Sequence, residues 1–540
     1  MSSIAGGITG VLDWLLACVP LMVVLLLMLR FRWGGAQAGV AGWASAQVVA
    51  ALRFGAGLPV LVYAQARGLL LTLYVLYIIW GALAFFRVTE AGGAVRAIGA
   101  VLPRLTPDRS FQVLLLGWIF ASFLQGVGGY GVPVAVVAPL FVTLGYTPAL
   151  AVVIPSIGHA WSVSFGSLGA SFYALIAATG RSAAELAPAG ALFSGIACLA
   201  CGVCVLLAAG GSPYLRRRWT TVVGLGVVMA ATQYAVLARG LSTLGSMLAA
   251  LSGLGVAVVW AGLRRARGAA TADSAPLPGE SKEQAAAPPG GTGSQLPILW
   301  ALLPYALLIL IVLTVSLIQP VGAFLGQVVI KVHFPEVRTA HGWVTAAGTG
   351  RSIDVFGHAG AQLLYAALLT YGLLRVGGFL RAGSAKKIAR AVVKGAGMSS
   401  LGIAAMVGMA ATMEHAGMTS LLADGIARLA GPAFPLVSPF IGVLGAFMTG
   451  SNTNSNVIFG NLQQQVAAIT GVNALIILAA QTSGAAIGSI FAPAKIIVAC
   501  STVNLGGKEG DALGATLRYG LAVVAVLALA AAAGVYVLAR

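Results

Sequence analysis

Long apolar runs, each closed by a few polar or basic residues, recur along almost the whole chain. One run covers Val11–Leu29 and ends at Arg30, and others cover Leu69–Phe86 and Leu299–Leu317. A helix needs about 20 largely apolar residues to cross the hydrocarbon core of a bilayer. The pattern therefore predicts an all-α polytopic membrane protein with about 12–14 transmembrane helices.

Polar or glycine-rich passages interrupt several of these apolar runs. In residues 450–456, a row of hydroxyl and carboxamide side chains follows Gly450. Hydrocarbon cannot satisfy the hydrogen bonds of such groups, and broken helices at membrane depth are tolerated where they line a cavity. Similar passages at 125–133, 157–167 and 481–495 predict further broken or re-entrant segments. A packing seam between helices is the alternative interpretation.

The chain divides into two weakly related halves, which we expect to be membrane regions 1–267 and 297–540. Residues 268–296 are rich in Ala, Pro, Gly and Ser without apolar periodicity, and this composition predicts a disordered cytoplasmic linker. Ala121–Gly126 in the first half is similar to Gly445–Gly450 in the second, and each precedes a polar passage. Glycine-interrupted segments at matching places in two halves indicate a transporter's midplane site.

Hydrophobic residues make up 59% of the chain and charged residues 8%, which excludes an ordinary soluble domain. The formal charge is +18, but the basic residues lie at the ends of apolar runs. They indicate cytoplasmic loops and not a nucleic-acid partner, and Arg30 predicts an N-terminus outside the cytoplasm. Cys198, Cys201 and Cys204 lie in an apolar run without a fourth ligand nearby, so we expect them to pack and not to bind metal.

Three motifs, in their order along the chain, are similar to those of the bacterial lactate permeases: Phe123–Pro139, Gly450–Leu462 and Val498–Asp511. The resemblance implies import of lactate, or of a related 2-hydroxy monocarboxylate such as glycolate, by proton symport across the bacterial cytoplasmic (inner) membrane. Ser451-Asn452-Thr453 resembles the hairpin-tip signature of a wider ion-transporter superfamily. That second resemblance implies an elevator-type carrier, and such carriers are often homodimers.

The chain departs from these permeases at several positions of their motifs. Gln125 stands where the resemblance implies a glutamate, and Asn452 stands where it implies an aspartate. The resemblance implies Gly-Asn-Thr-Ala-Pro where this chain has Gly158-His159-Ala160-Trp161-Ser162. It also implies a lysine near position 489, where this chain has Ser489. Two expected carboxylates are therefore missing, which leaves the coupling ion open between H⁺ and Na⁺ and the carboxylate unspecified.

A small carboxylate requires hydrogen-bond donors, a partly positive environment and an apolar wall around its short carbon chain. Helix N-termini, hydroxyls, carboxamides and a lysine meet the first two requirements, and aromatic rings meet the third. The candidate substrate-binding residues are Ser451, Asn452, Thr453, Asn454, Ser455, Gln125, Gly128, Gly129, Tyr130, His159, Trp161, Ser162, Lys495 and Gln481. For Lys495, the alternative is that its amine reaches the membrane interface.

Ionisable residues within membrane segments are costly to bury and are therefore candidates for ion coupling. We expect His159, or Glu414 with His415, to carry the proton that a carboxylate at position 125 would otherwise carry. Alternatively, Glu414 and His415 lie at a helix end in water, and His159 bonds a neighbouring hydroxyl. Asn452 and Asn456 are the candidates for Na⁺, which prefers oxygen ligands.

Other classes of membrane protein fit the sequence less well. An ion channel would favour rings of charge or carbonyls from several subunits. A membrane enzyme would need a nucleophile with a base, or a metal triad, and the chain contains neither H-E-x-x-H nor G-x-S-x-G. The sequence thus predicts a secondary carrier of a small carboxylate that lies in lipid and has no cofactor apart from its coupling ion; a sodium-coupled carrier of another organic anion is the alternative.

Overall fold

The computed structural model describes residues 10–31, 33–129, 131–266, 296–505 and 509–537. In this part of the chain, 11 helices are long and apolar enough to cross a membrane, or up to 12 if one bent pair counts as a single span. The bent pair is Pro148–Val163 with Gly166–Thr179, at 47° to each other. These helices confirm the predicted class of polytopic α-helical membrane protein.

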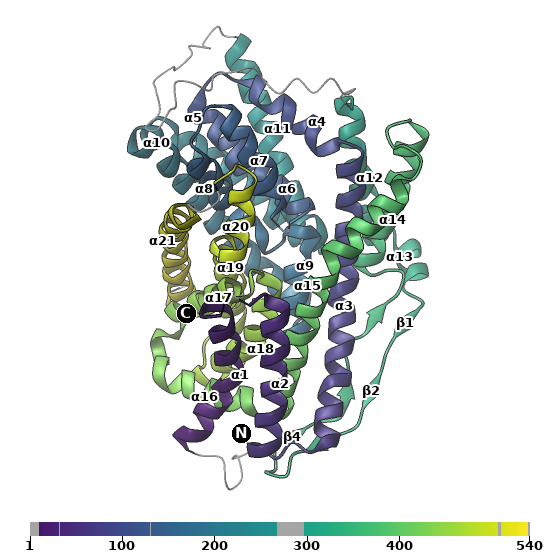
Figure 1. Cartoon of the computed structure of the whole chain (residues 1–540), viewed down its shortest axis with the longest axis vertical. Helices are drawn as coiled ribbons and strands as arrows, with labels where there is room; N and C mark the ends of the chain where they lie inside the picture. Colours follow the sequence, from purple (N-terminus) through teal and green to yellow (C-terminus); the bar gives the residue numbers. More distant parts are fainter. Residues whose placement is uncertain (1–9, 32, 130, 267–295, 506–508, 538–540) are drawn as a thin grey trace.

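One layer of the molecule is built around the long helix α3 and is called the α3 layer here (Figure 1). Helix α15 packs along α3 and α2, α14 packs on α3, and the remaining two helices pack on α2 and α14. The members of the layer are α1 (Val11–Leu29), α2 (Gly35–Arg53), α3 (Leu58–Ala91), α12 (Ile298–Leu317), α14 (Ala359–Val376) and α15 (Ser384–His415).

The second layer, called the α10 layer, contains all of the broken helices. Its first part comprises α5 (Arg109–Gln112), the π-helical segment η2 (Val113–Phe120), α6 (Ala121–Val127), α7 (Val132–Thr143), α8 (Pro148–His159), η3 (Ala160–Val163), α9 (Gly166–Thr179), α10 (Ala183–Leu237), η4 (Ser242–Leu244) and α11 (Gly245–Ala266). Its second part comprises α17 (Phe434–Thr449), α18 (Asn452–Thr470), α19 (Ala474–Gly488), η6 (Ser489–Phe491), α20 (Pro493–Ser501) and α21 (Glu509–Tyr536).

The same order of elements occurs twice along the described chain. A long helix of the α3 layer (α3 or α15) leads into a short helix, which is α4 (Ala94–Val101) or α16 (Met418–Ala430). The short turns η1 (Leu102–Leu105) and η5 (Gly431–Ala433) follow. Then come two broken helix pairs and a long helix, which is α21 or the part of α10 before its kink at Gly211. The domain boundaries around the linker stay a prediction, because residues 267–295 lie outside the described residues.

Helix breaks occur at each of the predicted passages. Gly129 has φ +61° and ends the turn after α6, and Gly450 has φ +68° between α17 and α18. Glycine adopts this left-handed conformation without the steric cost that a Cβ brings. Ser167 and Leu168, with φ of 48° and 57°, adopt it despite their side chains, so the break at the start of α9 is strained.

Small residues let α17 and α19, in the second half of the chain, approach closely. A Cβ added to Gly442 of α17 would collide with the carbonyl of Gln481 on α19, and one added to Gly484 would collide with the carbonyl of Pro439. Backbone contact of this kind is common between helices in lipid. The hydrophobic effect does not drive helices together there, so their association depends on close packing. The close packing makes α17, α18 and α19 a rigid support for the turn at Gly450.

Residues 329–354 form a two-stranded arm. Its antiparallel pairs are nested as β1 (Val329–Ile330) with β6 (Ile353–Asp354), β2 (His333–Phe334) with β5 (Gly348–Thr349), and β3 (Val337–Arg338) with β4 (Val344–Thr345). This β-arm runs along α3 toward the end of the molecule opposite α4 and α11, preceded by the short helix α13 (Gln319–Leu325) (Figure 1).

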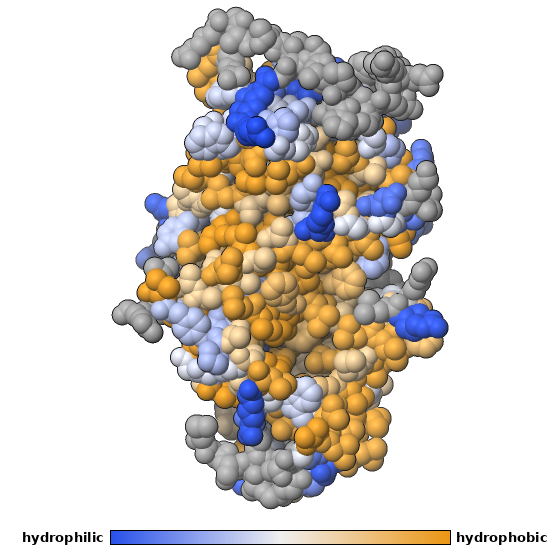
Figure 2. Space-filling view, turned by 90° about the vertical axis from the view of Figure 1, so that its left-hand side faces the viewer, coloured by the Kyte–Doolittle hydropathy of each residue, from blue (hydrophilic) through white to orange (hydrophobic). Residues whose placement is uncertain are grey.

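The outer surface fits a lipid environment. Large apolar side chains such as Leu52, Leu299 and Val376 are at least 77% exposed. Figure 2 shows an apolar band over the middle of one face, with hydrophilic residues mainly toward the two ends. A soluble protein rarely exposes so continuous an apolar surface, whereas a bilayer requires it.

Candidate functional site

The helix breaks surround a cavity of 320 Å³ between the two layers, called the central cavity here. The α10 layer contributes polar side chains to it: Gln125, Ser167, Ser171, Ser451, Asn452, Thr453, Asn454 and Lys495. The α3 layer contributes mainly small residues: Gly34, Gly35, Ala36, Ser399 and Gly402. The fold thus brings together six of the predicted site residues, and adds Ser167 and Ser171.

The N-terminus of α18 opens into the central cavity. Ser451 caps the helix, since its Oγ accepts a hydrogen bond from the Asn454 amide at 3.3 Å, and Thr449 Oγ1 accepts one from the Ser451 amide at 3.3 Å. The amides of Asn452 and Thr453 belong to the first helical turn and have no acceptor within the helix. These free donors and the helix dipole make this end of the helix attractive to an anion.

Asn452 is the least satisfied polar side chain on the cavity wall. It is 2% exposed, and neither its Oδ1 nor its Nδ2 has a hydrogen-bond partner among the described residues. The Oδ1 atom of the neighbouring Asn454 is likewise buried and unpaired there. Buried polar atoms almost always find a partner, so this amide fits a bound ligand, ion or water.

Hydrogen bonds across the α10 layer hold the cavity wall in place. Ser171 Oγ on α9 lies 3.1 Å from Thr453 Oγ1 on α18. One turn further along α18, Asn456 Nδ2 donates to the Ser171 carbonyl at 3.0 Å and to Thr482 Oγ1 on α19 at 2.9 Å. The two halves of the chain therefore meet through buried polar contacts beside the cavity.

Gln125 faces the break that precedes α9. A Cβ added to Gly166 would lie 2.8 Å from Gln125 Nε2, and one added to Gly129 would collide with Ser167 Oγ. The two glycines therefore allow Gln125 and Ser167 to approach each other at the cavity. Gly128 does not line the cavity, because it packs against the ring of Phe86.

Ser455 and Gln481 lie behind the cavity wall, among helices of the second half. Ser455 Oγ donates to the Gly442 carbonyl at 2.9 Å, and Gln481 Nε2 donates to Ser455 Oγ at 3.0 Å. Gln463 Nε2 donates to Gln481 Oε1. These side chains form hydrogen bonds with one another and with the backbone. They therefore support the cavity wall from behind and do not line the cavity.

The passage around His159 also lies outside the lining of the central cavity. His159 is buried with Nδ1 2.6 Å from the Pro155 carbonyl, and Ser162 Oγ donates to the His159 carbonyl at 2.7 Å. Trp161 is buried, and its carbonyl accepts a hydrogen bond from Ser194 at 3.0 Å. Tyr130 lies outside the described residues.

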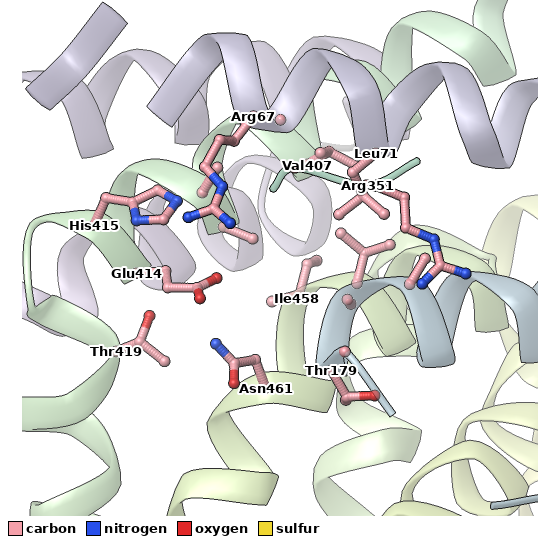
Figure 3. A pocket seen from close by; sticks show the side chains of 18 of the residues that line it. Arg67, Leu71, Thr179, Arg351, Val407, Glu414, His415, Thr419, Ile458 and Asn461 are labelled. Atoms are coloured by element: carbon pink, nitrogen blue, oxygen red, sulfur yellow. The ribbon is translucent and has the colours of Figure 1, made fainter. Parts of the chain in front are cut away.

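Glu414 and His415 line a different cavity, of 480 Å³ (Figure 3). It is called the arm cavity here because residues 349–352 of the β-arm also line it. Asn461 of α18 faces Glu414 across this cavity (Figure 3). Asn461 is nine residues beyond Asn452, or about 13 Å along the helix. The structure thus separates Glu414 from position 125, and it adds Arg67 and Arg351, which the sequence analysis did not select.

The described residues contain no group of three or more His, Cys, Asp or Glu side chains placed to hold a metal ion. Cys198, Cys201 and Cys204 are buried and free among the helices of the α10 layer. Lys495, on α20, is the cation nearest to the α18 N-terminus among the lining residues of the central cavity. The donors of the α18 N-terminus and the amine of Lys495 suit the binding of an anion.

The fold and the central cavity define a multi-pass membrane protein with a polar site enclosed between two helical layers. A family model described as L-lactate permease matches residues 13–538, so the chain belongs to the L-lactate permease family. It is 28% identical to the L-lactate permease of Bacillus subtilis (strain 168), over 94% of this chain and 93% of that one. It is 26% identical to the glycolate permease of Escherichia coli (strain K12), over 96% and 95%.

Among solved structures, the chain is similar to the YdaH transporter of Alcanivorax borkumensis. That similarity covers 85% of each chain, with 13% sequence identity and a TM-score of 0.42.

Proposed function

We propose that this protein carries L-lactate, glycolate or a close 2-hydroxy monocarboxylate across the bacterial cytoplasmic membrane. Relatives named as L-lactate and glycolate permeases, similar over nearly their whole length, support this substrate class. The observation that carries the proposal is the unpaired Asn452 amide beside the free N–H groups of α18, in a cavity that also contains Lys495.

In this proposal the substrate carboxylate binds at the N-terminus of α18. The amides of Asn452 and Thr453 donate to it, and the amine of Lys495 neutralises its charge. The Asn452 side chain offers both a donor and an acceptor, which suits the hydroxyl next to the carboxylate. A carrier that uses the hydroxyl in this way discriminates against simple fatty acids.

We propose that transport is an elevator movement of the α10 layer against the α3 layer. The helices that would carry the site, α9 and α18, contact α3 and α15 across the cavity. Gly34, Gly35 and Gly402, which have no side chain, lie on the α3 face of the cavity. The short helices α4 and α16 connect the layers and would act as the flexible links. A homodimer formed through the α3 layer would hold that layer still.

Protons are the coupling ion in this proposal. His159 Nδ1 lies 2.6 Å from the Pro155 carbonyl and donates to it in the neutral ring, so Nε2 is the nitrogen that would accept a proton. Its helix, α8, packs against α20, which carries Lys495. A second candidate is Na⁺, because Asn452, Asn454 and Asn456 each have a buried Oδ1 without a partner among the described residues.

Uptake of radiolabelled L-lactate and glycolate into proteoliposomes tests both parts of the proposal. A pH gradient and a Na⁺ gradient are imposed separately, each with and without an ionophore that collapses it. Uptake driven by the pH gradient alone supports proton coupling, and uptake driven by Na⁺ alone replaces it with sodium coupling. Absence of uptake under either gradient contradicts the proposed substrates.

A further inference from the structure

The arm cavity contains more charge than any other described cavity between the two layers. Arg67 of α3, Arg351 of the β-arm, and Glu414 and His415 of α15 line it, and α18 contributes Asn461. Figure 3 shows Arg67, Glu414 and Asn461 on one side and Arg351 on the other, with Leu71, Val407 and Ile458 between them. Arg67 thus lies beside the Glu414 carboxylate, and Arg351 lies across a partly apolar space from both.

Arg67 is held in place by the scaffold around it. Its guanidinium donates to Tyr63 Oη at 3.0 Å and to the Thr349 carbonyl at 3.4 Å. The same group lies over the rings of Tyr63 and Phe334. Arg67 therefore connects α3 to the β-arm and still presents part of its fork to the cavity.

Arg351 has fewer contacts. Its guanidinium carbon lies 4.2 Å from the centre of the Tyr74 ring, and its buried Nε atom has no hydrogen-bond partner among the described residues. A guanidinium prefers a planar oxygen pair such as a carboxylate. An anion in the cavity would supply that partner.

We propose that the arm cavity is a second binding site, which captures a short monocarboxylate between Arg67 and Arg351 before it reaches the central cavity. Glu414 is the competing anion for Arg67, so its protonation favours the bound carboxylate. The identity of the anion rests on the proposed function, but capture itself does not require transport. The volume of 480 Å³ is ample for a molecule of this size.

The surroundings of Glu414 support this competition. Arg67 faces it from α3, His415 lies next to it on α15, Asn461 faces it from α18, Thr419 from α16, and the β-arm adds Arg351. His415 is engaged by Thr345 of the arm, with Nδ1 3.2 Å from Oγ1, and by the edge of the Tyr63 ring. Glu414 is therefore the acidic group of this cavity, and Arg67 is its nearest cation.

A cysteine introduced by Ser352→Cys reports on the cavity, because Ser352 is an exposed lining residue. The rate of its modification by the anionic reagent methanethiosulfonate ethylsulfonate is compared with that of the cationic ethyltrimethylammonium analogue. Val344→Cys, exposed on the same arm and outside the lining, is the matched control. Cys18→Ser removes the native cysteine that is not buried.

We expect the anionic reagent to be favoured several-fold at position 352 relative to 344, and L-lactate to slow that reaction at least three-fold. Arg351→Gln, which leaves the Arg67 anchor of the β-arm intact, is expected to abolish most of the protection. With Glu414→Gln, we expect L-lactate to protect the cysteine at position 352 at pH 8 as strongly as it does at pH 5.5 when Glu414 is present. All rates are divided by the rate at position 344 under the same conditions.

Three results would overturn the inference. Equal protection by chloride means that the cavity holds an adventitious anion only. Protection that survives both Arg351→Gln and Arg67→Gln means that the guanidiniums do not bind the anion. Protection that disappears with Asn452→Ala means that it is transmitted from the central cavity. If protection follows the expectation while proteoliposomes show no uptake, the proposed function fails and the capture site stands.

Discussion

Ser171 Oγ on α9 lies 3.1 Å from Thr453 Oγ1 on α18, so a hydroxyl pair joins the first half of the chain to the second at the wall of the central cavity. Both side chains are buried. The pair sets the distance between the strained start of α9 and the first turn of α18. A substrate bound at the α18 N-terminus, as we propose, would therefore lie beside residues of both halves of the chain.

Asn452→Ala is expected to reduce lactate uptake more than ten-fold without lowering thermal stability. Its side chain has no hydrogen-bond partner to lose among the described residues, so truncation breaks no internal hydrogen bond and leaves no buried polar atom newly unpaired. Uptake in proteoliposomes and a thermal unfolding curve in detergent measure the two effects. A stable variant with normal uptake would exclude Asn452 from the substrate site.

Asn456→Ala is the contrasting change one turn along the same helix. Its Nδ2 donates to the Ser171 carbonyl and to Thr482 Oγ1, and its loss leaves buried acceptors unpaired. We expect a loss of about 1–3 kcal/mol in stability. An unfolding midpoint equal to that of the Asn452→Ala variant would contradict the assigned difference between the two amides.

Gly129→Ala is expected to distort the turn between α6 and α7. An alanine there would have φ +61°, and its Cβ would collide with Ser167 Oγ. Gly131→Ala is the matched control, because Gly131 also has positive φ, at +85°, but no atom lies within 4 Å of its added Cβ. The control is expected to cost only about 1 kcal/mol. The two variants are compared by their yield of monodisperse protein and by their lactate uptake.

Lys495→Gln is expected to raise the half-saturation concentration for lactate at least ten-fold while the protein remains folded. The lysine lines the central cavity, and removal of its charge leaves only neutral donors for the carboxylate. Lys386→Gln, at an exposed position on α15, controls for the loss of one positive charge. An unchanged half-saturation concentration in the Lys495 variant would indicate that the amine does not bind the substrate and reaches the membrane interface instead.

Asp108→Asn is expected to destabilise the α10 layer by about 3 kcal/mol near neutral pH, because it leaves Arg218 buried without its carboxylate partner. Burial opposes ionisation of Asp108, but Ser110 Oγ and Arg218 together hold its pKa below the usual range. The stabilisation is therefore complete above the unfolded pKa of about 4 and is lost as pH falls through the lower folded pKa.

Unfolding midpoints of the unchanged protein and of the Asp108→Asn variant, measured between pH 7 and pH 3, check this linkage. The difference between them should shrink as the pH falls. Glu336→Gln, in an exposed pair with Arg338, should change the midpoint little at any pH. A difference that is constant across the range would show that the Asp108 charge is not the cause.

Much of the fold could be predicted because helix position in a membrane depends on local composition. The expected first span Val11–Leu29 coincides with α1, and the breaks at Gly129 and Gly450 lie in passages where glycine permits a left-handed backbone. The β-arm was harder to predict, since its strands of two residues each carry no period-2 pattern. They form because the arm packs on α3, where Tyr63 meets Phe334.

The candidate site was harder to predict than the fold. Ser455 and Gln481 have the same side-chain chemistry as Asn452, and only their partners show that they brace helices. Ser167 and Ser171 look like ordinary small residues of a membrane helix, yet the strained break before α9 brings them to the cavity. No spacing along the chain records such partners, because they lie on other helices: Gln481 is 26 residues from Ser455, and Thr453 is 282 residues from Ser171.

The sequence by itself determined the membrane class, the approximate spans and the positions of the helix breaks. Each follows from the free energy of placing a short stretch of chain in hydrocarbon, where backbone groups must bond internally. The tertiary structure alone decided which polar groups are paired and which face a cavity. It placed Glu414 with Arg67 and Asn452 with Lys495, because side-chain desolvation and pairing depend on which helices meet.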